Sequence, residues 1–301
     1  MQASTQEFLK STLEAYRHQI DSALDRFLPP ESQRPKKLHQ AMRYSVFSGL
    51  PGQGGKRLRP ILTLGASELC AGKKEQALPA ACAIELVHTY SLIHDDLPAL
   101  DDDDFRRGKP SSHKAFGEAT AILTGDALLT LAFEIISREM PGDLAGPLTL
   151  ELARGAGSEG MIAGQAMDIE PDGKRNLDLL RYIHRHKTGS LIATSVRMGA
   201  IAARAPEKSL EKLSSFGENL GLAFQITDDL LDVEGKAAKL GKPVRRDQEQ
   251  GKLTYPSVLG LERSRVEAEN LIAKAVAELS YFGEKGEFLE ALARSILKRQ
   301  Y

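Results

Sequence analysis

Six aspartates lie within ten positions of this chain, between Asp95 and Asp104, and three basic residues follow at Arg106, Arg107 and Lys109. Carboxylates at this density repel one another unless cations neutralise them, and hard oxygen donors suit Mg2+ better than zinc or copper. A Mg2+ site usually completes its shell with substrate phosphates, which adjacent arginines can bind through two parallel hydrogen bonds. The stretch therefore predicts a magnesium site that binds a diphosphate.

Three other interpretations of this stretch differ in their requirements. An acidic run is usually a solvated face or a tail, but Leu97 and Leu100 interrupt this one, which favours a packed element. An EF-hand calcium loop does not fit, because the sixth position from Asp95 is Leu100 rather than Gly and the twelfth is Arg106 rather than Glu. The His94-Asp95 pair is also typical of helical metal-dependent phosphohydrolases, whose chemistry needs further histidine ligands.

A second acidic cluster follows far along the chain, in Gln225-Ile-Thr-Asp-Asp-Leu-Leu-Asp232. Asp228 and Asp232 are four positions apart and share one face of a helix, while Asp229 lies to its side. Like charges at this spacing destabilise a helix by a few tenths of a kcal/mol, so a purely structural helix has little reason to carry them. Two acidic patches on facing helices predict one diphosphate held through bridging Mg2+ ions.

With these motifs the chain resembles the trans-isoprenyl diphosphate synthases, and within them the bacterial short-chain farnesyl and geranyl diphosphate synthases. The first acidic motif reads Asp95-Asp96-(four residues)-Asp101, and the second reads Asp228-Asp229-(two residues)-Asp232. Upstream, the family's basic motif is matched by Gly54-Gly55-Lys56-Arg57-Leu58-Arg59-Pro60. The resemblance runs from about Ala41 to the end of the chain, with the motifs in family order, and implies the isoprenoid synthase fold.

The apolar pattern is helical almost throughout. Helices are expected at residues 8–28, 38–47, 60–69, 79–97, 117–140, 144–169, 177–203, 210–233, 255–261, 266–279 and 287–301. Pro98 should kink or end the helix that carries the first acidic motif and help to bring Asp101 to the pocket of Asp95. Residues 1–301 are predicted to form one all-α domain, a single-domain bundle of long, mostly antiparallel helices around a central active-site cavity.

Composition excludes several classes of protein. The 301 residues carry a formal net charge of −1, so nothing favours nucleic acid, and anions must be bound by local basic clusters. No uninterrupted apolar run approaches the roughly 18 residues of a membrane span, and Glu7, Glu14 and Asp21 make the N-terminus unlike a signal or transit peptide. Cys70 and Cys82 are typical of small buried side chains in a reducing compartment. A cytoplasmic protein with no integral membrane association is expected.

Carried residue by residue onto this chain, the resemblance implies two diphosphate sites. The homoallylic substrate, isopentenyl diphosphate, would be bound by Lys56, Arg59, His88 and Arg107. The allylic diphosphate would be bound by Arg106, Lys187, Thr188, Gln225 and Lys242. Two or three Mg2+ ions would lie between that group and Asp95, Asp101 and Asp228, supported directly or through water by Asp96, Asp102, Asp229 and Asp232. The catalytic groups would be Asp95, Asp96, Asp101, Asp228, Lys187 and Lys242.

Other polar and flexible residues are expected near these groups. Gln165 and Asp168 look like polar residues that face the same cavity. The Gly-rich loop 48–55 would let backbone N–H groups approach phosphate oxygens. It looks longer than the family's usual connection by about four residues, around Leu50 to Gln53.

The implied reaction separates an allylic cation from a diphosphate anion. Mg2+, Lys187 and Lys242 would stabilise the negative charge as it develops on the leaving group, without a covalent protein intermediate. The double bond of isopentenyl diphosphate then attacks the cation, and the departed diphosphate accepts the proton because no side-chain base is implied. The cavity must exclude water, which would otherwise hydrolyse the cation.

The length of the product depends on the floor of the cavity. Tyr90 lies five residues before Asp95 and Ser91 four before it, so both are candidate chain-length residues. An aromatic side chain at this place in the family goes with short products, which favours farnesyl diphosphate (C15) made through geranyl diphosphate (C10). The four-residue spacer of the first motif also occurs in C20-forming relatives, so a geranylgeranyl (C20) or a geranyl (C10) diphosphate synthase stays as the alternative.

Other classes and assemblies fit the sequence less well. A non-catalytic partner subunit would be expected to lose acidic or basic motifs, and this chain keeps them. A phosphohydrolase lacks its further ligands, since His184 and His186 are two apart and point to different faces of a helix. A terpene cyclase is not expected to carry Lys56, Arg59 and Arg107. The resemblance also implies a homodimer.

Overall fold

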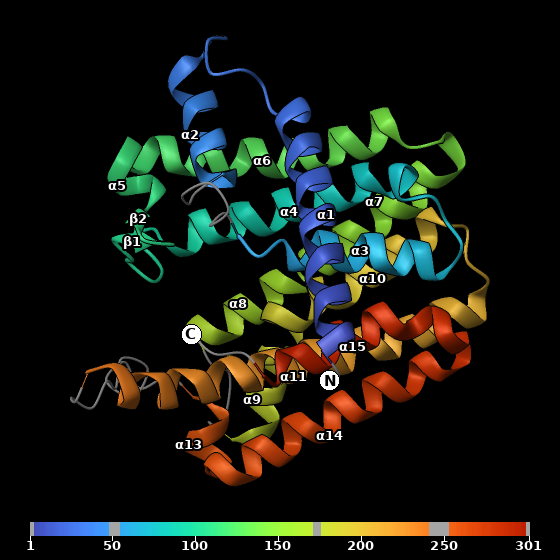
Figure 1. Ribbon diagram of the computed structural model, residues 1–301. Coiled ribbons are helices and arrows are strands. Elements are labelled where there is room, and N and C mark those ends of the chain that lie inside the picture. Colours follow the sequence, from blue (N-terminus) through green and yellow to red (C-terminus); the bar gives the residue numbers. More distant parts are fainter. Residues whose placement is uncertain (1–2, 48–54, 171–175, 241–252, 299–301) are drawn as a thin grey trace.

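In the computed structural model, the described residues are 3–47, 55–170, 176–240 and 253–298, and they form an all-α bundle (Figure 1). This confirms the predicted fold class. The helices are α1 (Ala3–Phe27), α2 (Lys36–Val46), α3 (Leu58–Leu69), α4 (Lys74–Asp95), α5 (Ser112–Phe116), α6 (Glu118–Glu139), α7 (Gly142–Ala156), α8 (Met161–Ile169), α9 (Leu177–Ile183), the π-helical η1 (His184–Gly189), α10 (Ser190–Ala202), α11 (Glu207–Leu240), α13 (Tyr255–Leu259), α14 (Leu261–Leu279), the 3-10 helix η2 (Ser280–Gly286) and α15 (Glu287–Ile296). The only strands among these residues are β1 (Phe105–Arg106) and β2 (Lys109–Pro110), an antiparallel pair that the sequence did not predict.

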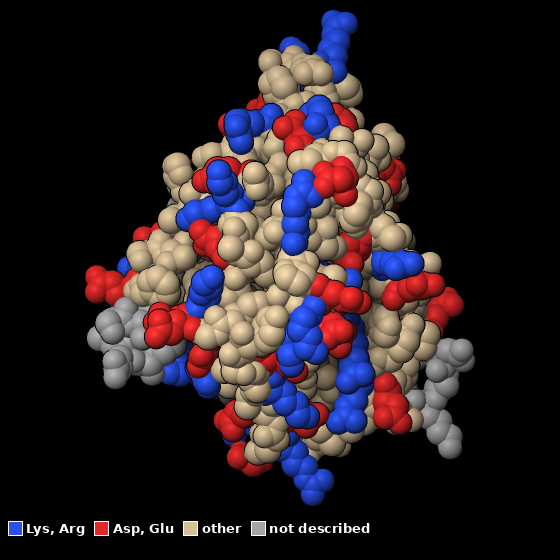
Figure 2. Space-filling view, turned by 90° about the vertical axis from the view of Figure 1, so that its right-hand side faces the viewer, with Lys and Arg blue, Asp and Glu red and all other residues tan. Residues whose placement is uncertain are grey.

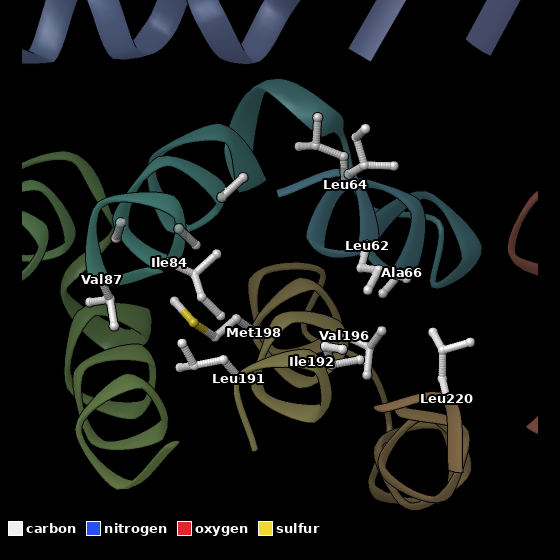
Figure 3. Packing of buried hydrophobic residues seen from close by; sticks show 14 of the residues in the cluster. Leu62, Leu64, Ala66, Ile84, Val87, Leu191, Ile192, Val196, Met198 and Leu220 are labelled. Carbon is white, nitrogen blue, oxygen red and sulfur yellow. The ribbon is translucent and has the colours of Figure 1, made fainter. Parts of the chain in front are cut away.

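Helix α10 lies at the centre of the bundle and contacts α3, α4, α7 and α11. Figure 3 shows Leu191 and Met198 of α10 beside Ile84 of α4, and Val196 beside Leu62 of α3. All five side chains are fully buried, and burying one such side chain contributes roughly 1.5–3 kcal/mol. This packing fixes α4 and α11, the helices that carry the acidic motifs, and both run toward the left side of Figure 1.

Three of the predicted long helices differ from the structure in ways that bear on the site. The helix predicted at 144–169 is wrong, because α7 and α8 are separate helices. The backbone turns so tightly at Gly160 that a Cβ atom would collide with the carbonyl oxygen atoms of Gly155 and Arg154. The helix predicted at 177–203 is continuous but widens at η1, and a single π-helical turn is frequent at functional sites. Helix α4 begins at Lys74, five residues before the predicted start, and includes Pro79.

Helix α6 is long and apolar enough, by length and composition alone, to cross a membrane. It packs against α2, α4, α5 and α7, and Leu128, Ala132 and Ile135 on it are fully buried. The core helix of a globular bundle has the same properties, so α6 is weak support for a membrane span. Its outer face exposes Ile122 and Leu123, which are 44% and 58% exposed.

One face of the molecule shows how the charges are distributed. Figure 2 shows acidic and basic side chains interspersed on the right-hand side of the molecule, with no large area of one sign. This agrees with the expectation that anions are bound by local clusters rather than by a global field.

Candidate active site

A cavity of about 400 Å3 opens between the end of α4, α8 and η1. Its predicted members are Arg59, His88, Tyr90, Ser91, Asp95, Gln165, Lys187 and Thr188. The remaining walls are largely apolar and consist of Leu92, His94, Leu100, Met161, Ile162, Ala166 and Ile169. A cavity with apolar walls and a few converging polar groups is the usual form of a small-molecule site.

The first acidic motif lies at the C-terminal end of α4, which ends at Asp95. The following turn brings the chain back, and the backbone N–H of Asp101 donates to the carbonyl oxygen of Asp95 over 2.8 Å. The helix therefore ends before Pro98, as predicted. Burial raises the pKa of Asp95 to about 6; the Lys187 ammonium opposes this shift and repulsion from Asp101 adds to it. Neighbouring carboxylates repel one another when ionised, so their arrangement favours a divalent cation that offsets their charge. Carboxylate oxygen atoms are also the ligands that Mg2+ prefers.

Asp96 has a different surrounding from Asp95. It is 2% exposed, and the Nε atom of Arg106 donates to both of its carboxylate oxygens, over 3.0 and 3.2 Å. The Nη2 atom of Arg106 also contacts Asp96 and lies 3.5 Å from Asp103. Asp96 thus orients Arg106, the predicted allylic-diphosphate ligand on β1.

A basic cluster forms the other polar wall of the site. Arg59 is buried, and its Nε atom has no hydrogen-bond partner among the described residues. Burial lowers the pKa of Arg59 to about 10, and Glu85 opposes the shift. Burial, with Arg59 and Arg107 nearby, holds the pKa of His88 well below its usual range. A Cβ atom on Gly55 would lie 2.5 Å from the Arg107 guanidinium, so the basic motif lies directly against Arg107. Converging arginines with an unused buried donor are suited to binding an anion.

Lys187 and Thr188 lie on the π-helical turn η1. The Nζ atom of Lys187 donates to Asp168 over 2.6 Å, and Thr188 Oγ1 donates to Gln225 Oε1 over 2.7 Å. Burial lowers the pKa of Lys187, but Asp168, with Asp95 and Asp101, outweighs this effect and the pKa is raised. A Cβ atom on Gly164 of α8 would collide with the backbone of Lys187. Close approach of α8 therefore fixes this turn beside the first acidic motif.

The residues of the second acidic motif differ in burial, and none of Asp228, Asp229 and Asp232 lines the cavity. Asp228 and Asp232 are partly exposed, and Asp228 acts electrostatically on Arg59. Asp229 is 7% exposed and accepts hydrogen bonds from the Tyr255 backbone N–H (2.9 Å) and Gln225 Nε2 (3.3 Å). Asp229 therefore holds the first residue of α13 against α11, a role that the sequence did not predict.

Some predicted residues fall elsewhere. Lys242 and the loop positions Leu50 to Gln53 lie outside the described residues. Asp102 is exposed and lies on the outer side of the acidic stretch, where one ligand atom each of Asp102, Asp104 and His113 fall within 4.8 Å of one another. Such a group could hold a cation, although Lys114 already pairs with Asp104 over 2.8 Å.

Comparison with known proteins agrees with this geometry. The family model described as Polyprenyl synthetase matches residues 35–292. The chain is 48% identical to a farnesyl diphosphate synthase of Geobacillus stearothermophilus over 265 residues, 86% of each chain. It is 44% identical to the large subunit 1 of a heterodimeric chloroplastic geranylgeranyl pyrophosphate synthase of Arabidopsis thaliana, over 93% of this chain and 76% of that protein.

Solved structures give the same result. An apo FPP/GFPP synthase of Zymomonas mobilis is 39% identical with a TM-score of 0.84, over 96% of this chain and 98% of that one. A geranyltransferase of Legionella pneumophila is 34% identical with a TM-score of 0.86, over 98% of both chains. The fold and site are those of a trans-prenyltransferase. The chain belongs to the polyprenyl synthetase family.

Proposed function

We propose that this protein is a Mg2+-dependent prenyltransferase that condenses isopentenyl diphosphate with dimethylallyl and geranyl diphosphates to give farnesyl diphosphate. The observation that carries the proposal is the cavity itself. One polar wall holds Arg59 with an unused buried donor beside His88, and the other holds Asp95 and Lys187. Two separate anion sites at the mouth of an apolar cavity suit a reaction between two diphosphates with hydrocarbon tails.

Each of these side chains has its own role in the proposed reaction. Asp95, Asp101 and Asp228 would hold Mg2+, which supplies Lewis-acid stabilisation of the leaving diphosphate. Lys187, held by Asp168, donates to the same diphosphate as negative charge grows on it. Arg59 and Arg107 fix the second diphosphate so that the isopentenyl double bond lies against the allylic carbon. The departed diphosphate accepts the proton that is lost when the new bond forms.

The apolar wall protects the cation and limits the chain. Tyr90 is 6% exposed, lines the cavity and lies edge-on to His94 with ring centroids 5.7 Å apart. It lies about one and a half helical turns below Asp95, where a growing chain would meet it. This supports C15 as the product, while the relatives include both farnesyl and geranylgeranyl diphosphate synthases. A C20 or C10 product is the alternative.

Product analysis tests the proposal. Wild-type protein and Tyr90→Ala are incubated with Mg2+, isopentenyl diphosphate and dimethylallyl diphosphate, and the products are separated by chromatography. We expect mainly C15 from the wild type and longer chains from Tyr90→Ala. Tyr182→Ala is the matched control, since Tyr182 stacks on His186 outside the cavity, and its product should stay C15. Wild-type C20 would overturn the chain length, and no condensation would overturn the activity.

We also propose a cytoplasmic homodimer. The exposed Ile122 and Leu123 on α6 form an apolar surface that a second copy could cover. Cys70 and Cys82 are both unpaired, as in a reducing compartment. Light scattering on the purified protein tests the assembly: a mass of two chains is expected, and Leu123→Glu should reduce it to one. A monomeric wild type would refute the dimer.

A further inference from the structure

Arg57 lies between two predicted diphosphate ligands, Lys56 and Arg59, but it does not face the cavity. Lys56 is exposed, whereas Arg57 is 3% exposed. Its backbone has a φ of 51°, in the left-handed region, directly before the first residue of α3. A residue other than glycine persists in this conformation only where its surroundings hold it.

The surroundings of Arg57 do hold it. Its Nε atom donates to Asp21 over 2.8 Å, its Nη1 atom to Glu85 over 2.7 Å, and its Nη2 atom to the Val46 carbonyl over 2.9 Å. These three acceptors belong to α1, α4 and α2. One side chain thus ties the start of α3 to three other helices.

Glu85 is the centre of this arrangement. It is 1% exposed and lies on α4, one turn before His88. Besides its contact with Arg57, it acts electrostatically on Arg59 and Arg107. Three arginines therefore converge on one buried carboxylate, whose charge offsets part of their mutual repulsion.

We propose that Glu85 and Arg57 are positioning residues for the isopentenyl diphosphate site: their ion pair fixes the start of α3, and with it Lys56 and Arg59, beside His88 and Arg107. The pair does not touch the substrate. It acts by presetting the geometry of the groups that do, in the way that outer-shell partners orient metal ligands. This inference rests on the proposed function, which gives the basic cluster its substrate.

The steady-state kinetics of Glu85→Gln test the positioning role of Glu85, because this variant keeps the shape of the side chain and removes its charge. We expect KM for isopentenyl diphosphate to rise between about 10- and 100-fold, the range seen for outer-shell partners of metal ligands. KM for dimethylallyl diphosphate should change less than about twofold. Calorimetric binding of isopentenyl diphosphate alone should weaken by the same factor as KM.

Glu151→Gln is the matched control. Glu151 of α7 accepts two hydrogen bonds from Arg197 of α10, over 2.7 and 2.9 Å, away from the basic cluster. Glu151→Gln should lower the melting temperature of the protein without changing the KM for isopentenyl diphosphate or for dimethylallyl diphosphate. If Glu85→Gln does not fold, Asp21→Asn removes the half-exposed partner of Arg57 and should raise the same KM by a smaller factor.

Two outcomes overturn the inference. One is a folded Glu85→Gln or Asp21→Asn protein with an unchanged KM for isopentenyl diphosphate. The other is an equal rise of both KM values, which would mean a general loss of structure. Neither outcome would contradict the proposed function. That function is contradicted only by a wild-type protein that does not bind isopentenyl diphosphate or does not form product.

Discussion

Replacing Asp95 with asparagine is expected to stabilise the metal-free protein at pH 8, although it removes a group that the proposed reaction needs. Burial raises the pKa of Asp95 above its ordinary value of 3.8 to about 6. A carboxyl group with a raised pKa destabilises the folded state once it ionises. The penalty is therefore absent well below pH 3.8, grows as the pH rises, and is complete above about pH 6.

The magnitude follows from the size of the shift. A rise from 3.8 to about 6 corresponds to about 3 kcal/mol of unfolding free energy, at about 1.36 kcal/mol per pKa unit. About half of this penalty is present at pH 5, where the folded carboxyl is still mostly protonated. An asparagine of the same shape does not ionise, so Asp95→Asn should gain about this free energy at pH 8.

Urea unfolding in the presence of a chelator, at pH 5 and pH 8, measures the effect. Asp104→Asn is the control in the same acidic stretch. Asp104 is exposed, and its hydrogen bond from Lys114 lowers its pKa, so this variant should lose rather than gain stability at pH 8. Added Mg2+ should stabilise the wild type more than Asp95→Asn. An Asp95→Asn protein no more stable than the wild type at pH 8 would refute the reasoning.

Three further predictions follow from single contacts. Lys187→Met should lower kcat about 100- to 1,000-fold, as the loss of one donor to a developing oxyanion does; an unchanged kcat at saturating substrates would contradict its role. Asp229→Ala leaves the buried Tyr255 amide unpaired, which should cost about 1–3 kcal/mol in urea unfolding, and a neutral result would show that Asp229 does not hold α13. Removing divalent cations with a chelator should abolish product formation and added Mg2+ should restore it, whereas turnover in excess chelator would exclude a metal requirement.

The sequence predicted most of the helices, and eight of the residues that it singled out line the cavity. Apolar residues recur at helical spacing, and this predicted the helices α4 and α11. Pro98 predicted the end of α4 and a bend that brings Asp101 back toward Asp95, and the backbone N–H of Asp101 donates to the Asp95 carbonyl oxygen. The prediction at 144–169 was wrong because apolar residues continue across Gly160, and only the path of the backbone shows the break.

The roles of buried polar residues were beyond the sequence. Spacing places Asp228 and Asp229 next to each other, but it cannot show that Asp229 meets the amide of Tyr255, which is distant in the chain. Glu85 lies in a largely apolar stretch of α4. A single charged residue in such a stretch could have indicated that it is buried and paired with a basic group. Its partner Arg57 could not be recognised, because it lies in a basic motif whose other members, Lys56 and Arg59, were both expected to bind diphosphate.

The most direct test of the account is the stoichiometry of the reaction. Purified protein with Mg2+, isopentenyl diphosphate and dimethylallyl diphosphate should release one diphosphate for each carbon–carbon bond formed, and the chains should stop mainly at C15. Diphosphate release without any longer prenyl product, from folded protein with metal and both substrates present, would contradict the proposal that this cavity joins two diphosphates.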